Sequence, residues 1–336
     1  MALRIIKVNP ERPEIEKLRE AAKILKNGGL VAFPTETVYG LGCDGLNEEA
    51  VERLYRVKGR KPTKPVILHI HNPLQAEEVA EVNDVARALM DEFFPGPLAL
   101  VLKKKDIVPD VTSGHTDRIA VRMPANRVAL KLIELSETAI AAPSANRSGS
   151  ISPTRAEDVL EEFGDDIDAV VDGGETDVGI ESTVLDVSEV EKGRAVVLRI
   201  GAVTLEELEE VLEEFGVELA LPGDWGKGEH YRVKGKVMVV DPSAIHQVVS
   251  DLAKTARVGV CAFEDVIDEM LESMDAETAR KVVLFRVKNE EDYSRKLFRA
   301  MREMKDCDYL VFQSVRETGI GRAIMARLRE AERSSL

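Results

Sequence analysis

The feature that most restricts the fold is a regular alternation of short apolar and amphipathic segments beyond residue 236. Segments with helical periodicity separate four apolar stretches, which are residues 237–240, 258–261, 282–285 and 309–312. Strands that alternate with helices pair in parallel, because a helix has to carry the chain back before the next strand begins. The sequence therefore predicts a small doubly wound, Rossmann-like α/β domain at the C-terminal end.

The first 205 residues mix helices and strands less regularly. Helical spacing of apolar residues predicts helices at 14–26, 48–57 (capped by Asn47) and 154–163, and two more within 74–94. Apolar or alternating runs predict strands that end at Phe33 and cover 65–70, 97–102, 118–123, 138–142, 183–187 and 196–200, the last two paired. Residues 220–235 contain five Gly or Pro residues, which predicts a linker between domains at 1–219 and 236–336.

The composition excludes several classes of protein. A net charge of −15 and a pI near 5.0 argue against a nucleic-acid surface along the whole chain, although 46 Lys and Arg leave room for a local basic cleft. Cys43, Cys261 and Cys307 are too scattered for a zinc site or a disulfide framework. Neither a signal-like N-terminus nor a run of about 18 apolar residues occurs, so we expect a soluble, cytoplasmic protein with no membrane segment.

The most unusual polar stretch follows the apolar run that ends at Phe33 and reads PTETVYGLG. Pro34 is expected to end the strand, and the hydroxyls and the carboxylate of Thr35 to Tyr39 are expected to line a cleft. Gly40 and Gly42 are expected to let the backbone turn tightly or approach a ligand closely.

Two basic elements point to an anionic ligand. Residues 58–64, KGRKPTK, place four cations within seven positions, which suits a loop that neutralises a polyphosphate or a solvated basic loop. Arg118 and Arg122 lie four apart on a predicted strand and therefore project from the same face. Because a buried charge needs a partner, they indicate either an anionic ligand or salt bridges to Asp or Glu.

Other polar elements are less specific. Residues 142–149, followed by Ser152, form a loop that either holds a ligand or only caps the next helix, and residues 179–183 lead into a strand whose neighbour ends at Arg199. His69 within an apolar strand suits a hydrogen-bonded core histidine, and His71 alone does not complete a metal site.

Gly319 and Gly321 supply two of the three glycines of a dinucleotide fingerprint, so we expect a helix start and no cofactor there. No nucleophile elbow, Walker loop or Cys beside a base is present. The inventory therefore favours chemistry by positioning and charge neutralisation, without a covalent enzyme intermediate.

Taken together, the motifs resemble those of the YrdC-type L-threonylcarbamoyladenylate synthases. The resemblance rests on PTETVYGLG, K-x-R-x-x-x-K-P with the following VILHI, RIAVRMP and APSANRSG, in this order. The linker and second domain resemble the longer archaeal and yeast-like form of the family. In the linker, Leu221-Pro-Gly and His230-Tyr231 match the family pattern, whereas the segment between them is longer and has Trp225 in place of the usual tyrosine.

The resemblance implies a twisted, mostly parallel α/β sheet with a basic concave cleft, and an enzyme that joins L-threonine, bicarbonate or CO₂, and ATP into threonylcarbamoyl-AMP. A threonylcarbamoyl-transferase complex would then pass the group to the adenosine beside the tRNA anticodon, with any contact to tRNA indirect. Mg²⁺ is expected to accompany ATP without protein side-chain ligands. The linker is expected to fold over the active site.

The resemblance also implies the roles of individual residues. The expected threonine-binding residues are Thr37, His69, Arg122, Ala142 and Ser182. The expected ATP-binding residues are Arg60, Lys64, Arg118, Ser144, Asn146, Ser152, Arg199 and Tyr231, with Lys58 and Arg60 as the catalytic pair.

Two other functions remain open at this point. The first is a module that binds double-stranded RNA or tRNA without turnover, against which the net charge of −15 counts. The second is a carbamoyl-transfer domain of the kind used in hydrogenase maturation, which normally brings cysteine-rich zinc fingers that three scattered cysteines cannot form.

Overall fold

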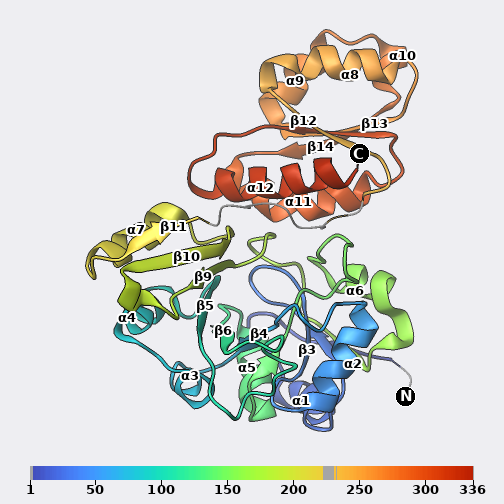
Figure 1. The fold of residues 1–336 in the computed structure, drawn as a ribbon. Helices are drawn as coiled ribbons and strands as arrows, with labels where there is room; N and C mark the ends of the chain where they lie inside the picture. Colours follow the sequence, from blue (N-terminus) through green and yellow to red (C-terminus); the bar gives the residue numbers. More distant parts are fainter. Residues whose placement is uncertain (1–2, 222–230, 232, 336) are drawn as a thin grey trace. The chain divides into compact units, whose positions relative to one another are not determined.

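The computed structural model describes residues 3–221, 231 and 233–335 and divides the chain into two compact units (Figure 1). The first unit comprises Met1–Ser148 and Ser152–Gly223, and the second comprises Gly149–Ile151 and Asp224–Leu336. Most of the predicted linker, residues 222–230 and 232, lies outside the described residues. Within the described ranges, no helix is both long and apolar enough to cross a membrane.

The first unit is built on an 11-stranded sheet of mixed direction. In spatial order its strands are β1 (Arg4–Lys7), β8 (Ala169–Asp172), β2 (Val31–Phe33), β3 (Gly40–Asp44), β7 (Ile140–Ala141), β4 (Ile67–His69), β6 (Arg118–Arg122), β5 (Leu98–Lys103), β9 (Thr183–Asp186), β10 (Arg194–Arg199) and β11 (Glu218–Ala220). The predicted pairing of the strands near 183–187 and 196–200 is confirmed as the antiparallel pair β9–β10.

The helices of the first unit are α1 (Ile15–Lys26), α2 (Glu48–Lys58), α3 (Leu74–Val79), α4 (Asp84–Phe93), α5 (Arg127–Ser136), α6 (Ala156–Phe163) and α7 (Leu205–Glu213). Asn47 caps α2 as predicted, because its side chain accepts a hydrogen bond from the backbone N–H of Ala50. Leu18 and Leu25 of α1 and Leu132 of α5 are fully buried in one core cluster with Phe33, so these helices cover the sheet where β2 ends.

Of the two roles expected for Gly40 and Gly42, the tight turn is wrong, and the close approach to a ligand stays a prediction. Both glycines belong to β3, which runs antiparallel to β2 with Gly40 opposite Phe33, and neither has a positive φ. A Cβ on Gly42 would lie 2.6 Å from Cε1 of Phe33 and 2.8 Å from Cγ2 of Ile140. Gly42 is therefore required for packing, since the Phe33 ring occupies the space that a side chain would need, whereas a Cβ on Gly40 would lie 3.3 Å from Cβ of Ala142.

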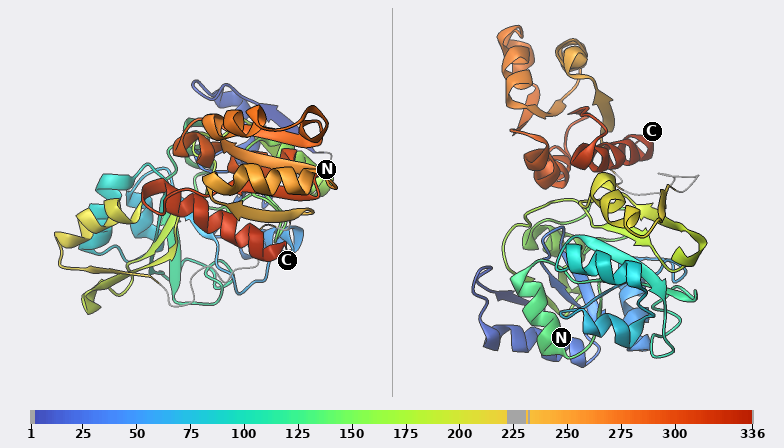
Figure 2. Two further views of the ribbon diagram at one scale, coloured as in Figure 1. Left: turned by 90° about the horizontal axis from the view of Figure 1, so that it is seen from above. Right: turned by 90° about the vertical axis from the view of Figure 1, so that its left-hand side faces the viewer.

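The second unit confirms the predicted doubly wound domain. Its strands are β12 (Lys236–Val240), β15 (Tyr309–Gln313), β13 (Val258–Phe263) and β14 (Val282–Val287), in that spatial order and all parallel. Its longer helices are α8 (Ile245–Ala253), α9 (Glu264–Glu272), α11 (Glu290–Glu303) and α12 (Gly319–Ser334), with α10 (Ala276–Ala279) a single turn. Figures 1 and 2 show α8 and α9 on one face of this sheet and α11 and α12 on the other. Gly319 begins α12, so the expected helix start is also confirmed.

Candidate active site

The loop after β2 carries two hydroxyl groups in contact, those of Thr35 and Thr37. Thr35 Oγ1 lies 2.7 Å from the backbone oxygen of Val38 and 2.9 Å from Thr37 Oγ1. Because a carbonyl oxygen only accepts, the single Thr35 proton goes to Val38, and Thr35 Oγ1 also accepts from the backbone N–H groups of Thr37 at 3.2 Å and Val38 at 3.3 Å. Thr37 Oγ1 then accepts from Arg122 Nη2 at 3.0 Å and keeps one further lone pair. Towards a ligand, the Thr37 hydroxyl offers this lone pair as an acceptor.

Arg122 at the end of β6 is paired with a carboxylate for which the sequence predicted only a place in the lining of a cleft. Its Nη2 atom lies 2.8 Å from Glu36 Oε1, and only 5% of the Arg122 side chain and 6% of the Glu36 side chain are exposed. Arg122 Nε also donates to the backbone oxygen of Gly96 at 3.3 Å. Glu36 is visible in the sequence as the one carboxylate of the PTETVYG stretch, but its partner is known only from the fold.

His69 lies opposite Arg122 in the parallel pairing of β4 with β6. Burial, followed by the positive charge of Arg122, lowers the pKa of His69 to about 3. Its ring is therefore neutral at physiological pH and can hydrogen-bond a ligand without adding charge. The backbone of Ala142 lies beside the same strand, since its N–H donates to the oxygen of Ile67 at 3.0 Å.

Ser182 and Arg199, expected in different subsites, are in direct contact. Arg199 Nε donates to the Ser182 backbone oxygen at 2.8 Å, and Arg199 Nη2 donates to Ser182 Oγ at 2.9 Å. The charge of Arg199 also contributes to the lowered pKa of His69, which places the two side chains in one electrostatic environment. A residue expected to bind threonine and one expected to bind ATP therefore adjoin at this point.

The buried side chain of Lys58 ties the basic loop to the loop after β7. Its Nζ donates to the backbone oxygens of Ser144 and Asn146, and its own backbone oxygen accepts from the N–H of Ser148 at 2.8 Å. Burial, assisted by the nearby charge of Arg60, lowers the pKa of Lys58 to about 7. A buried amine that titrates near neutrality is a sensitive partner for an incoming anion.

The remaining predicted nucleotide residues differ in how freely they can meet a ligand. Arg60 donates to backbone oxygens of its own loop, to Lys64 at 3.3 Å and to Pro65 at 2.8 Å, while the Lys64 side chain is exposed. Ser152 is buried and donates to Glu181 Oε1 at 2.7 Å.

Arg118 is not brought into this group by any contact in the described residues. Its guanidinium pairs with Asp186 at 2.7 Å, Glu189 at 3.2 Å and Asp117 at 3.7 Å. Of the two interpretations that the sequence left open for Arg118, the salt bridges are therefore present. Three carboxylates therefore already compensate its charge, although about a third of the side chain is exposed.

Tyr231 belongs to the second unit, where 6% of its surface is exposed and its ring lies 5.1 Å from that of Phe298. Its φ of 65° places it in the left-handed region that non-glycine residues rarely adopt. Its role towards ATP stays a prediction. His230 lies outside the described residues.

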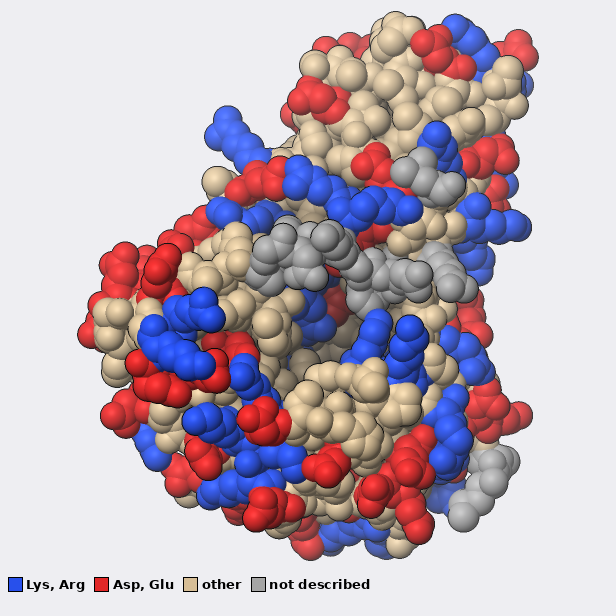
Figure 3. Space-filling view, in the orientation of Figure 1, with Lys and Arg blue, Asp and Glu red and all other residues tan. Residues whose placement is uncertain are grey.

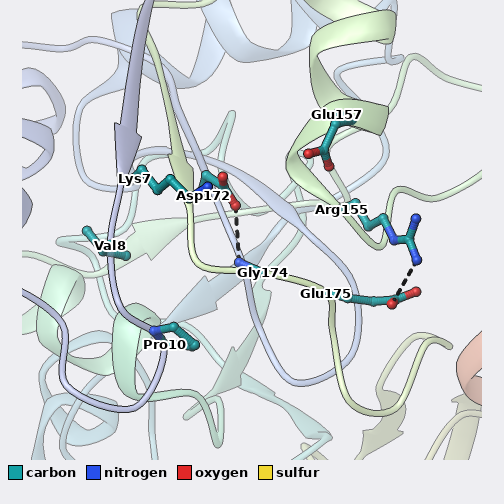
Figure 4. Close-up of a pocket in the computed structure, with 8 residues that line it drawn as sticks. All are labelled: Lys7, Val8, Pro10, Arg155, Glu157, Asp172, Gly174 and Glu175. Atoms are coloured by element: carbon teal, nitrogen blue, oxygen red, sulfur yellow. Dashed lines mark hydrogen bonds and ion pairs between the residues drawn. The ribbon is translucent and has the colours of Figure 1, made fainter.

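The surface of the first unit is hollowed on the face that Figure 3 shows, and Lys and Arg side chains gather around the hollow despite the acidic composition. A separate cavity of about 390 Å³ is drawn in Figure 4. Its lining residues are Lys7, Val8, Pro10, Arg155, Glu157, Asp172, Gly174 and Glu175. None of them is a predicted site residue, and Arg155 is already paired with Glu175 at 2.9 Å.

Fold and site together define a class: a two-domain α/β protein whose first domain has a polar site of buried, mutually paired charges on the loops of a mixed sheet. Residues 23–201 match the family model Sua5/YciO/YrdC, described as telomere recombination, and residues 203–332 match the C-terminal domain of threonylcarbamoyl-AMP synthase. The chain belongs to this family, in its two-domain form, which confirms the resemblance seen in the motifs.

The chain is similar to relatives along almost its whole length. It is 42% identical to the threonylcarbamoyl-AMP synthase of Pyrococcus abyssi, over 96% of this chain and 95% of the relative, and 35% identical to that of Bacillus subtilis, over 94% and 92%. Among solved structures, P. abyssi Sua5 complexed with L-threonine matches with a TM-score of 0.87 and 40% identity, covering 98% of both chains. The likeness therefore includes both units.

Proposed function

We propose that the protein is a threonylcarbamoyl-AMP synthase that joins L-threonine, bicarbonate or CO₂, and ATP and releases pyrophosphate. The observation that carries the proposal is the full-length similarity to synthases, of which one structure is solved with L-threonine. The reaction is a nucleotidyl transfer: a carbamate oxygen formed on threonine attacks the α-phosphorus of ATP. Its product would serve tRNA modification, after a partner transferase complex moves the threonylcarbamoyl group to the adenosine beside the anticodon.

The amino acid would bind around Arg122. The guanidinium is suited to a carboxylate, and its Nη1 atom is not used by the contacts to Glu36, Thr37 and Gly96. Thr37 supplies an acceptor and the neutral ring of His69 a further polar contact. We assign Ser182 and the backbone at Ala142 to the same subsite. Ser182 is hydrogen-bonded to Arg199, whose charge acts on His69, and the Ala142 N–H is bonded to Ile67 in the strand that carries His69.

The nucleotide would bind along the basic loop and the loop after β7. Lys58, Arg60 and Lys64 can neutralise the phosphates and the departing pyrophosphate, since charge builds up on these oxygens as the bond breaks. Ser144, Asn146, Ser152 and Arg199 complete the proposed set beside them. Arg118 and Tyr231 remain in the proposal on the strength of the motif alone.

Mg²⁺ would reach the site on ATP and not in a protein cage. The described residues contain no cluster of three or more His, Cys, Asp or Glu side chains arranged to hold a metal ion. Phosphate oxygens are suitable ligands for Mg²⁺, which commonly keeps few protein contacts when it accompanies a nucleotide. In this proposal, Lys58, Arg60 and Lys64 would act on the MgATP complex through their own charges and hydrogen bonds.

The direct test is pyrophosphate release from MgATP with and without L-threonine and bicarbonate. We expect release only when both are present, with Arg122→Ala raising the KM for threonine and Arg60→Ala raising that for ATP. Circular dichroism and thermal unfolding check that each variant is folded. If the folded wild-type protein released no threonine-dependent pyrophosphate, the synthase assignment would fall, and salt-sensitive RNA binding would be measured next.

A further inference from the structure

Glu36 is a buried carboxylate to which the proposed chemistry has so far given no role. Its backbone oxygen accepts from the N–H of Val178 at 2.8 Å, so the loop after β2 is fixed against the segment that leads to β9. Its Oε1 atom lies 2.8 Å from Arg122 Nη2 but lacks the geometry of a hydrogen bond, and its Oε2 atom has no hydrogen-bond partner among the described residues. A buried carboxylate with acceptor capacity left unused is costly unless something else occupies it.

The surrounding charges leave Glu36 dependent on Arg122. His69 is neutral, Arg199 donates to both oxygens of Ser182, and Glu181 accepts from Ser152. Within the described part of the chain, Arg122 is the cation in contact with Glu36. If an incoming carboxylate took over Arg122, two buried negative charges would share one guanidinium. A ligand that brings its own positive charge beside the carboxylate removes this excess, and an amino acid zwitterion is such a ligand.

We infer that Glu36 receives the ammonium group of the amino-acid substrate while Arg122 receives its carboxylate. A substrate zwitterion thereby exchanges partners with a buried ion pair, and every charge keeps a partner of opposite sign. The inference rests on the proposed function and names the acceptor of the reacting nitrogen. Thr37, which accepts from the same Arg122 nitrogen, offers a second oxygen to the ammonium or hydroxyl of the substrate.

The same placement gives the reacting nitrogen a proton acceptor. An ammonium group has no lone pair, so it must lose a proton before it can attack carbon. Transfer of that proton to Glu36 Oε2 leaves a neutral amine and a neutral carboxylic acid, and the net charge of the pocket is unchanged. With bicarbonate as the carbon source, the N–C bond then forms as the C–OH bond breaks. The second nitrogen proton leaves in the water that is formed, and a carbamate remains.

A purely structural role for Glu36 makes a different prediction. If Glu36 only orients Arg122, its loss should weaken every carboxylate ligand alike. If it binds the ammonium, its loss should weaken only ligands that carry one. The 2-hydroxy analogue of L-threonine, in which a hydroxyl replaces the ammonium group, separates the two cases.

The experiment measures Kd by isothermal titration calorimetry for both ligands with wild type, Glu36→Gln and Glu36→Asp. Glu175→Gln is the matched control, because Glu175 is also paired with an arginine but belongs to the separate cavity. We expect Glu36→Gln to lose about 10- to 100-fold in affinity for threonine, as for a charge-assisted hydrogen bond, with no loss for the analogue. Glu36→Asp should keep part of the preference for threonine, and Glu175→Gln all of it.

At saturating threonine, the kcat of Glu36→Gln for pyrophosphate release should fall by about 100-fold or more, as expected when a proton acceptor is removed. Equal losses for both ligands, or no loss with threonine, would overturn the inference while leaving the synthase assignment intact. Failure of the folded wild-type protein to bind threonine would instead remove the proposed function and this inference with it.

Discussion

Binding of ATP should be accompanied by proton uptake at Lys58. In the free protein, burial lowers the pKa of Lys58 to about 7, so its amine is mostly neutral at pH 8. Phosphate groups placed beside it stabilise the ammonium form and raise its pKa. With a pKa of about 7 in the free protein, full protonation on binding takes up ~0.9 proton per site at pH 8 and ~0.1 proton at pH 6. ATP is fully ionised at pH 8, so the nucleotide itself does not contribute to the measured proton uptake.

The uptake is measured by titrating MgATP into the protein at pH 8 in buffers of different ionisation enthalpy. The slope of observed enthalpy against buffer enthalpy gives the number of protons exchanged. Lys58→Arg keeps a cation that cannot deprotonate, and Lys58→Met removes the amine, so both variants should abolish the uptake. Lys61→Met removes an exposed lysine of the same loop and should leave it unchanged. A slope of zero for wild-type protein that binds MgATP would refute the reasoning.

Two further predictions concern the free energy of unfolding. His69 has a folded pKa of about 3, below its ordinary value near 6.5, so the unfolded state binds a proton first and stability falls as the pH drops through 6.5. Between pH 7 and pH 5 the free energy of unfolding of the wild type, measured with urea, should fall by ~2 kcal/mol more than that of His69→Asn. An equal fall in both proteins would contradict a buried, neutral His69 ring. Gly42→Ala should lower the free energy of unfolding by about 2 kcal/mol, because the new methyl group would collide with Phe33. Gly193→Ala should lower it by about 1 kcal/mol, because its φ of 75° is unfavourable for alanine although the space around it is open. Similar losses in the two variants would show that β3 has room for a methyl group.

The second unit could be predicted almost completely from its sequence, because each of its strands is a short apolar run between helices. The apolar runs alone locate such strands, because a parallel strand that helices cover on both faces is apolar along its whole length. Asn47 was equally predictable, because a cap acts on the N–H groups a few positions along the chain. These are local rules, and they succeed where the structure is determined locally.

The first unit was harder because its decisive contacts join distant segments. Strand β3 reads as a run of breakers, and only the Phe33 ring that lies against Gly42 explains why it is a strand. Strand β1 was missed because it is a short edge strand whose Ile5 is 59% exposed, so it lacks a buried apolar signal. In the site, Arg118 could not be assigned to ion pairs before Asp186 was known to face it.

Glu36 is the clearest example of a site residue whose environment could not be predicted from the sequence. In the sequence it is one carboxylate among hydroxyls, and nothing nearby indicates that it is buried or that its partner lies on β6. In the fold, the free site already has its charges compensated: Arg122 by Glu36, Arg199 by the oxygens of Ser182, and Lys58 by carbonyls and a lowered pKa. A ligand can enter such a site only by supplying charges that replace these partners. A zwitterion and a polyphosphate satisfy that condition on the two sides, which is why selectivity here should follow ligand charge more strongly than ligand size.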